Sequence, residues 1–380
     1  ALAAGTIEYI DNALIERYYA AVMAQALRPE LGKTAGLRLV YTPLNGSGLV
    51  PVMTVLKRMG HTDITVVPEQ EKPDGDFPTC PYPNPEILEA MQLGLSLCEK
   101  LGADLLLATD PDSDRVGTAV LQNGAPRLIS GNEMGVLLLD YICRTRLELC
   151  KMPENPVAVR SIVSTTMSDA VAAHYGVEMR QVLTGFKYIG EQIAHLEAEG
   201  HPERFLFGFE ESYGYLSGGY VRDKDAVVAS MLICEMAAWY KGQGKNLGEA
   251  LDDLYAQYGY YFNKVDSYTF PGSDGMEKMA VLMQKLRTEL PFVIGSRAVT
   301  GHTDYETGLR YEDGEGRTHT GLPAADVMEF RFGKEGSLVA RPSGTEPKLK
   351  FYYSLRASDR AAAEAAYGEI KASVERWLGL

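Results

Sequence analysis

The stretch ADLLLATDPDSDRVG, residues 103–117, is an apolar run that ends in three aspartates at every second position. The apolar part is typical of a buried β-strand, and the charged part follows directly after it. Upstream of this stretch, strand and helix patterns alternate. We expect strands within 37–48 and 62–70 and helices at 48–60 and 87–101. This alternation is the signature of a doubly wound parallel sheet.

The alternation restarts at residue 155 and predicts a second α/β domain. Its expected strands lie within 155–166, 178–185 and 204–212, and its expected helices lie at 167–176, 186–200 and 225–241. From about residue 265 the chain becomes rich in β segments and closes with a helix at 358–377, which is typical of a smaller α+β domain. The predicted fold is therefore α/β, with two doubly wound α/β domains followed by a smaller α+β C-terminal domain. The expected divisions are a helical segment at 1–33, then domains at 34–154, 155–264 and 265–380.

Composition narrows the classes of partner. The 380 residues are 46% hydrophobic and carry a net charge of −14, which argues against nucleic acid or an anionic membrane as a partner. Five scattered cysteines and the lack of a visible signal peptide favour buried free thiols in the cytoplasm. The first residue is Ala1 rather than Met, so we expect a piece of a longer protein.

The aspartate triplet predicts a metal site. Asp110, Asp112 and Asp114 leave one residue between successive carboxylates, so a loop can turn all three toward one point. Their mutual repulsion favours a hard divalent cation, most plausibly Mg²⁺. An EF-hand is excluded because Arg115 and Leu121 stand where that loop needs Gly and Glu. A phosphatase with an aspartate nucleophile is an incomplete match, and a solvated acidic turn is the remaining alternative.

The segment RPSGTEPK, residues 341–348, predicts a phosphate-binding loop between two strands. Arg341 offers a planar fork for phosphate oxygens, and Gly344 lets backbone N–H groups approach. Hydroxyl donors come from Ser343 and Thr345. A hairpin turn rich in Pro and Gly is the structural alternative.

Two further motifs carry polar groups that suit a sugar. GFEESYGY, residues 208–215, supplies Glu210 and Ser212, and carboxylate and hydroxyl together suit vicinal sugar hydroxyls. VRDKDAVV places Lys224 between two aspartates before a helix, and this arrangement is compatible with a lysine that transfers protons. An exposed acidic turn and a surface ion-pair cluster are the respective alternatives.

Seven motifs in this order resemble domains two, three and four of the α-D-phosphohexomutases. They are TPLNGSG, DFPTCPYPNPE, ATDPDSDRVG, TGFKYIG, GFEESYGY, RDKDAV and RPSGTEPK. The likeness extends over essentially the whole chain and is nearest to the phosphoglucomutase and phosphopentomutase branch. In that family a phosphoryl group moves between O1 and O6 of a hexose phosphate through a bisphosphorylated sugar of the glucose 1,6-bisphosphate type.

The resemblance implies a role for each motif. Asp110, Asp112 and Asp114 are the implied Mg²⁺ ligands. Arg115 is implied to lie beside a phosphoserine, Lys224 to act as general acid and base, and Lys187 to face the cleft. The implied substrate-binding residues are Glu210, Ser212, Arg341, Ser343, Gly344 and Thr345. The Glu-x-Ser motif is compatible with glucose, mannose, a pentose or an amino sugar.

The sequence departs from the family in one respect. The family's nucleophile is a phosphorylated serine in a Thr-Ala-Ser-His-Asn-Pro-like loop, and no Ser-His pair occurs in these 380 residues. We therefore expect a mutase chain that is inactive alone. Two alternatives stay open: a non-catalytic phosphosugar-binding protein and a phosphatase that uses Asp110 as its nucleophile.

Overall fold

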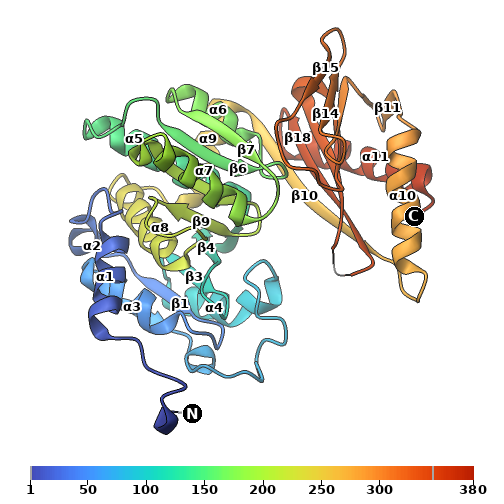
Figure 1. Cartoon of the computed structure of the whole chain (residues 1–380). Coiled ribbons are helices and arrows are strands. Elements are labelled where there is room, and N and C mark those ends of the chain that lie inside the picture. Colours follow the sequence, from blue (N-terminus) through green and yellow to red (C-terminus); the bar gives the residue numbers. More distant parts are fainter. Residues whose placement is uncertain (1, 345) are drawn as a thin grey trace. The chain divides into compact units, whose positions relative to one another are not determined.

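The computed structural model describes residues 2–344 and 346–380, which form two compact units (Figure 1). The first unit comprises the chain up to Arg160 together with Val171–Arg180 and Gly185–Asp252. The second comprises Ser161–Ala170, Gln181–Thr184 and Asp253–Leu380. The domain boundaries predicted at residues 34, 155 and 265 stay predictions.

A five-stranded sheet in the order β2-β1-β3-β4-β5 carries the aspartate stretch. Its strands are β1 (Leu39–Thr42), β2 (Ile64–Val66), β3 (Leu105–Thr109), β4 (Val116–Gln122) and β5 (Ala125–Ile129). The first three are parallel, as predicted, and β3 is buried along its whole length. The antiparallel strands β4 and β5 were not predicted, although Asn123 and Gly124 both have positive φ and form the two-residue turn that joins them.

Helices flank this sheet and precede it. They are α1 (Asn12–Met23), α2 (Leu31–Thr34), α3 (Leu49–Arg58) and α4 (Leu88–Leu101). The single helical segment predicted over residues 1–33 is wrong in extent, because α1 covers only Asn12–Met23 and α2 is a separate short helix. Between them, Pro29 disfavours helical conformation in the residue before it. The predicted helix at 87–101 is confirmed by α4.

A second sheet has the order β7-β6-β8-β9. Its strands are β6 (Val157–Ser161), β7 (Glu178–Val182), β8 (Phe205–Glu210) and β9 (Gly214–Ser217). β6 and β8 are parallel, while β9 returns antiparallel to β8. The associated helices are α5 (Gly131–Glu148), α6 (Met167–His174), α7 (Phe186–Ala198), α8 (Ala226–Lys241) and α9 (Leu247–Tyr258). Helices α5 and α9 were not predicted, although Ser130 and Glu133 form a capping box at the start of α5.

The second unit contains a seven-stranded antiparallel sheet in the order β10-β18-β17-β16-β13-β14-β15. The strands are β10 (Tyr260–Thr269), β13 (Gly301–Asp304), β14 (Leu309–Glu312), β15 (Gly316–His319), β16 (Met328–Arg331), β17 (Gly336–Pro342) and β18 (Lys348–Ala357). Helices α10 (Gly275–Thr288) and α11 (Arg360–Leu378) pack on it through a shared apolar core. A small ribbon of β11 (Val293–Ile294) and β12 (Arg297–Ala298) completes the unit. The predicted α/β class with an α+β C-terminal part is confirmed.

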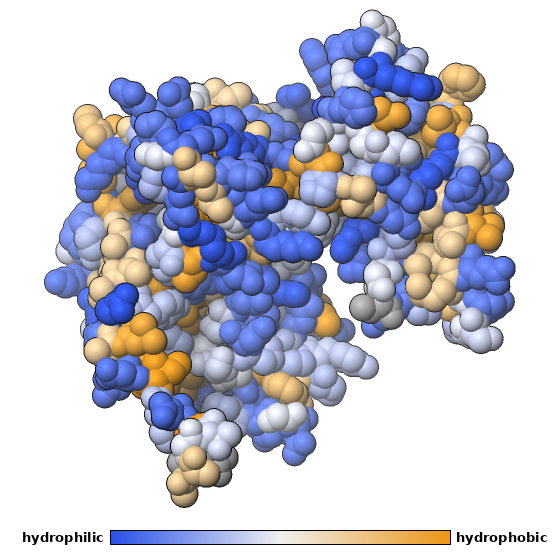
Figure 2. All heavy atoms as spheres, viewed as in Figure 1, coloured by the Kyte–Doolittle hydropathy of each residue, from blue (hydrophilic) through white to orange (hydrophobic). Residues whose placement is uncertain are grey.

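Short 3-10 turns and the surface complete the description. The turns are η1 (Leu2–Ala4), η2 (Pro68–Gln70), η3 (Pro202–Arg204) and η4 (Gly333–Glu335). Four of the five cysteines are buried free thiols, as predicted, whereas Cys150 is exposed. Polar side chains cover most of the face seen in Figure 2, with apolar residues in scattered groups. None of the helices in the described part of the chain combines the length and apolar character needed to span a bilayer.

Candidate functional site

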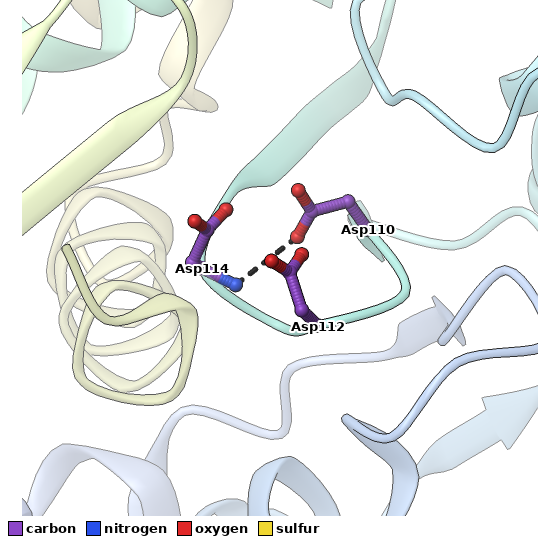
Figure 3. Close-up of side chains that lie close together, drawn as sticks. All are labelled: Asp110, Asp112 and Asp114. Atoms are coloured by element: carbon purple, nitrogen blue, oxygen red, sulfur yellow. Dashed lines mark hydrogen bonds between the residues drawn. The ribbon is translucent and has the colours of Figure 1, made fainter. Parts of the chain in front are cut away.

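The aspartate triplet forms a closed loop directly after β3. Asp110 is buried, and its Oδ1 accepts hydrogen bonds from the backbone N–H groups of Asp114 at 3.1 Å and Arg115 at 2.9 Å. The loop turns through Ser113, which has a positive φ, and continues as β4. Each aspartate offers one carboxylate oxygen, and these oxygens lie within 4.8 Å of one another (Figure 3).

The chemistry of this loop fits a hard divalent cation. Burial raises the pKa of Asp110 to about 7, and repulsion from Asp114 and Asp112 acts in the same direction. Asp114 Oδ1 is buried and accepts no hydrogen bond from any described residue. A divalent cation that prefers oxygen ligands would relieve the repulsion and use that unsatisfied oxygen.

The TPLNGSG turn packs against the aspartate loop. The backbone N–H and the hydroxyl of Ser47 both donate to the carbonyl oxygen of Pro111, at 2.8 and 2.9 Å. Gly46 lies so close that a Cβ there would be 2.3 Å from Pro111 Cα. The glycine is therefore required for the two turns to pack together.

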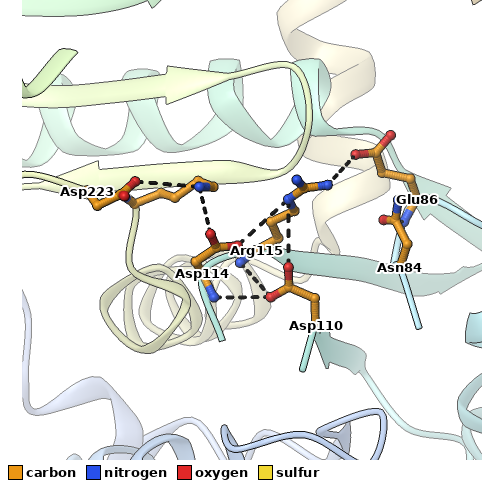
Figure 4. A network of polar contacts seen from close by, with 7 residues as sticks. Asn84, Glu86, Asp110, Asp114, Arg115 and Asp223 are labelled. Atoms are coloured by element: carbon orange, nitrogen blue, oxygen red, sulfur yellow. Dashed lines mark hydrogen bonds and ion pairs between the residues drawn. The ribbon is translucent and has the colours of Figure 1, made fainter. Parts of the chain in front are cut away.

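Two cations lie beside the loop (Figure 4). Lys224 Nζ is 2.6 Å from Asp114 Oδ2 and 3.5 Å from Asp223 Oδ1. Although burial alone lowers the pKa of Lys224, the hydrogen bond and charge of Asp114 raise it above its usual value. Arg115 Nη1 is 3.4 Å from Glu86 Oε1, and its Nε is 3.7 Å from both Asp110 Oδ2 and Asp114 Oδ1. Both cations are thus held within the carboxylate cluster.

Backbone pairing connects this loop to the GFEESYGY turn. Arg115 pairs with Gly214 in an isolated antiparallel bridge, and Val116 N–H donates to Tyr213 O at 3.1 Å. Glu210, the last residue of β8, is buried and accepts a 2.6 Å hydrogen bond from Gly185 N–H. Burial raises the pKa of Glu210 to about 7, and the charge of Glu211 adds to this.

The remaining predicted residues are placed as follows. Ser212 is half-buried in the turn between β8 and β9. Lys187 is exposed on α7, and its ammonium lies 4.8 Å from the centre of the Tyr188 ring. The structure therefore brings Asp110, Asp112, Asp114, Arg115, Lys224 and Glu210 together, while the predicted role of Lys187 stays a prediction.

In the second unit, the RPSGTEPK segment is the hairpin connection between β17 and β18. Arg341 lies opposite Lys350 in the strand ladder, and Ser343 N–H donates to Lys348 O at 2.8 Å. Gly344 is exposed, and Thr345 lies outside the described residues. The segment thus joins two paired antiparallel strands and carries Arg341, and its phosphate-binding role stays a prediction.

Three family models match successive parts of the chain. They describe phosphoglucomutase/phosphomannomutase alpha/beta/alpha domain II at residues 16–124, alpha/beta/alpha domain III at 130–258 and the C-terminal domain at 309–370. The chain belongs to the phosphoglucomutase/phosphomannomutase family. This assignment agrees with the α-D-phosphohexomutase resemblance of the motifs.

Curated relatives of the family support this assignment over most of the chain. A phosphoglucomutase of Staphylococcus haemolyticus is 39% identical over 321 residues, covering 84% of this chain and 57% of that protein. A phosphoglucomutase of Staphylococcus aureus strain MRSA252 is 36% identical over 325 residues, covering 85% and 57% respectively. The chain thus spans little more than half the length of these relatives.

Solved structures of the family share the fold. A putative phosphomannomutase from Thermus thermophilus matches with a TM-score of 0.65 at 18% identity, covering 99% of this chain and 68% of that one. The open form of parafusin, a phosphoglucomutase from Paramecium, matches with a TM-score of 0.67 at 16% identity, covering 96% and 63%.

The sequence did not predict the roles of two residues that adjoin the predicted ones. Glu86, which pairs with Arg115, lies in a proline-rich motif that carries no chemical signature of its own. Asp225 is the N-cap of α8 and also accepts hydrogen bonds from Tyr18 and Tyr220. An aspartate directly before an apolar helical run is a recognised cap signal and could have identified it.

Proposed function

We propose that this chain is the metal- and substrate-binding part of a phosphosugar mutase that interconverts hexose 1-phosphate and hexose 6-phosphate, with glucose as the preferred sugar. The observation that carries the proposal is the cluster of the aspartate triplet, Arg115, Lys224 and Glu210 in a member of this family. The working location we infer is the cytoplasm, and the partner is a small sugar phosphate.

Asp110, Asp112 and Asp114 would hold Mg²⁺, which when bound neutralises charge on the transferring phosphoryl group. Arg115 adds a fixed positive charge beside these ligands, where the phosphoryl group carries its negative charge. Lys224 holds a proton that it can donate to the sugar oxygen as the phosphoryl group leaves, and take back in the reverse direction. Positioning and charge neutralisation account for most catalysis of this kind.

Glu210 and Ser212 would bind the sugar hydroxyls. The Gly185 N–H occupies one carboxylate oxygen of Glu210, which leaves the other to accept from a hydroxyl. Arg341, Ser343, Gly344 and Thr345 would hold the phosphate that does not react, and Lys187 would face the cleft. The intermediate we infer is a sugar carrying two phosphates, because a cation can recognise each phosphate group.

The phosphoryl donor we infer is a phosphoserine that is not among these 380 residues, because no Ser-His pair occurs in them. The chain by itself should therefore bind a sugar phosphate without turning it over. A full-length gene product that contains the serine loop should catalyse the exchange, primed by a glucose 1,6-bisphosphate-type activator.

The test compares the isolated chain with the full-length gene product. Calorimetry on the chain should show that glucose 1-phosphate binds more tightly with Mg²⁺ present, and that Asp110→Asn removes this gain. Coupled assays of the full-length protein on glucose 1-phosphate, mannose 1-phosphate and ribose 1-phosphate should rank glucose first. Release of inorganic phosphate by the isolated chain, abolished by Asp110→Asn, would refute the mutase and support a phosphatase.

A further inference from the structure

Arg115 raises a problem for any metal bound beside it. Its Nε lies 3.7 Å from both Asp110 Oδ2 and Asp114 Oδ1, which is beyond hydrogen-bond distance. A shift of about 0.8 Å would turn either approach into a charge-assisted hydrogen bond. Such a bond would occupy a carboxylate oxygen that a cation needs, so Arg115 is a potential competitor for the site.

The guanidinium is held off these carboxylates by a third one. Within residues 2–344 and 346–380, the only hydrogen bond of the Arg115 side chain runs from Nη1 to Glu86 Oε1, at 3.4 Å (Figure 4). The buried Nε has no hydrogen-bond partner in the same part of the chain. Glu86 therefore holds the Nη1 end of the guanidinium, while Nε stays beyond hydrogen-bond distance of both aspartates.

Local contacts hold the backbone at Glu86 in place. Its backbone N–H donates to Asn84 Oδ1 at 3.0 Å, which closes a tight turn. The preceding Pro85 is buried against β4, where a Cβ on Gly117 would lie 2.6 Å from Pro85 Cβ. The proline-rich motif thus docks on the strand that begins just after Arg115, and it presents the Glu86 carboxylate to the guanidinium.

We propose that Glu86 is a positioning residue that holds Arg115 clear of Asp110 and Asp114, so that these carboxylates stay open to a divalent cation. The inference rests on the proposed metal site. Each side chain of the pair is 35% exposed, so the contact is a partly solvated ion pair rather than a buried one. Its loss should raise the Kd for a divalent cation roughly fivefold.

Mn²⁺ binding to the chain at pH 8, measured by calorimetry or from the EPR signal of the free ion, tests this role. Glu86→Asp keeps the charge and withdraws the carboxylate by one methylene, so positioning predicts the roughly fivefold rise in Kd and simple charge attraction predicts none. Arg115→Met should bind Mn²⁺ at least as tightly as the native chain. In that background Glu86→Asp should have no effect. Glu89→Gln, which removes an exposed charge three residues away, is the matched control.

The outcomes separate this inference from the metal site itself. An unchanged Kd in Glu86→Asp, an equal loss in the Arg115→Met background, or weaker binding by Arg115→Met alone would overturn the role of Glu86. Asp110→Asn reports on the site. If Asp110→Asn binds Mn²⁺ with the native Kd, the proposed metal site and the proposed role of Glu86 are both wrong. If Asp110→Asn loses binding while Glu86→Asp leaves the Kd unchanged, only the proposed role of Glu86 is wrong.

Discussion

Glu210→Gln tests whether the site contains a buried negative charge, because glutamine has nearly the same shape as glutamate and Glu210 is buried. The side chain is 5% exposed, and its Oε1 accepts the 2.6 Å hydrogen bond from Gly185 N–H. Burial and the neighbouring Glu211 raise the pKa of Glu210 from 4.5 to about 7. Glutamine keeps the acceptor oxygen but cannot ionise, so the substitution isolates the effect of the charge.

The sign follows from proton binding. Because the pKa of Glu210 is higher in the folded state than in the unfolded state, the folded state binds more protons between pH 4.5 and 7, and stability falls as pH rises through this range. The shift corresponds to about 3 kcal/mol once the pH is above both values. Glu210→Gln should therefore gain about 3 kcal/mol over the native chain at pH 8 and less than about 0.5 kcal/mol at pH 4.5.

Urea unfolding at pH 4.5, 6 and 8 measures this difference. The chain has two tryptophans, Trp239 in the first unit and Trp377 in the second. A Trp377→Phe background leaves Trp239 to report on the unit that contains Glu210. Glu191→Gln, on the exposed face of α7, is the control and should show no such pH dependence. A gain that is equal at pH 4.5 and pH 8, or that is larger at pH 4.5, would refute the assigned burial of charge.

Three other perturbations test the surrounding structure. Because Asp110 must lose a proton whose pKa is about 7 before it binds a cation, the Kd for Mn²⁺ should rise about tenfold between pH 8 and pH 6, and a flat profile would contradict this. Gly46→Ala places a Cβ 2.3 Å from Pro111 Cα and should weaken Mn²⁺ binding at least about tenfold, whereas Gly75→Ala, with open space around it, should leave the Kd unchanged. Tyr18→Phe removes a 2.9 Å hydrogen bond to Asp225 and should lower the urea stability of the first unit by about 1–2 kcal/mol, while Tyr9→Phe, at 87% exposed, should have no effect.

The parts of the site that could be predicted are those encoded locally. Asp110 and Glu210 each end an apolar run, and the carboxyl ends of strands in an open α/β sheet are where ligands bind, so both positions followed from the pattern. The contacts that could not be predicted join distant segments. Glu86 and Arg115 are 29 residues apart, and Tyr18 and Asp225 are 207 apart, so their meeting depends on how whole elements pack.

The main-chain bridge between Arg115 and Gly214 links the aspartate loop to the end of β8. On one side of it the backbone N–H of Arg115 is tied to Asp110, and on the other side Gly214 pairs with Glu210 at the end of β8. Lys224 packs over the same glycine, where a Cβ would lie 2.5 Å from its Cδ, while its ammonium reaches Asp114. A displacement of the aspartate loop therefore displaces the carboxylate proposed to bind the sugar and the lysine proposed to move the proton. Cation and sugar phosphate should accordingly bind with a mutual coupling free energy, because each orders a backbone segment that the other uses.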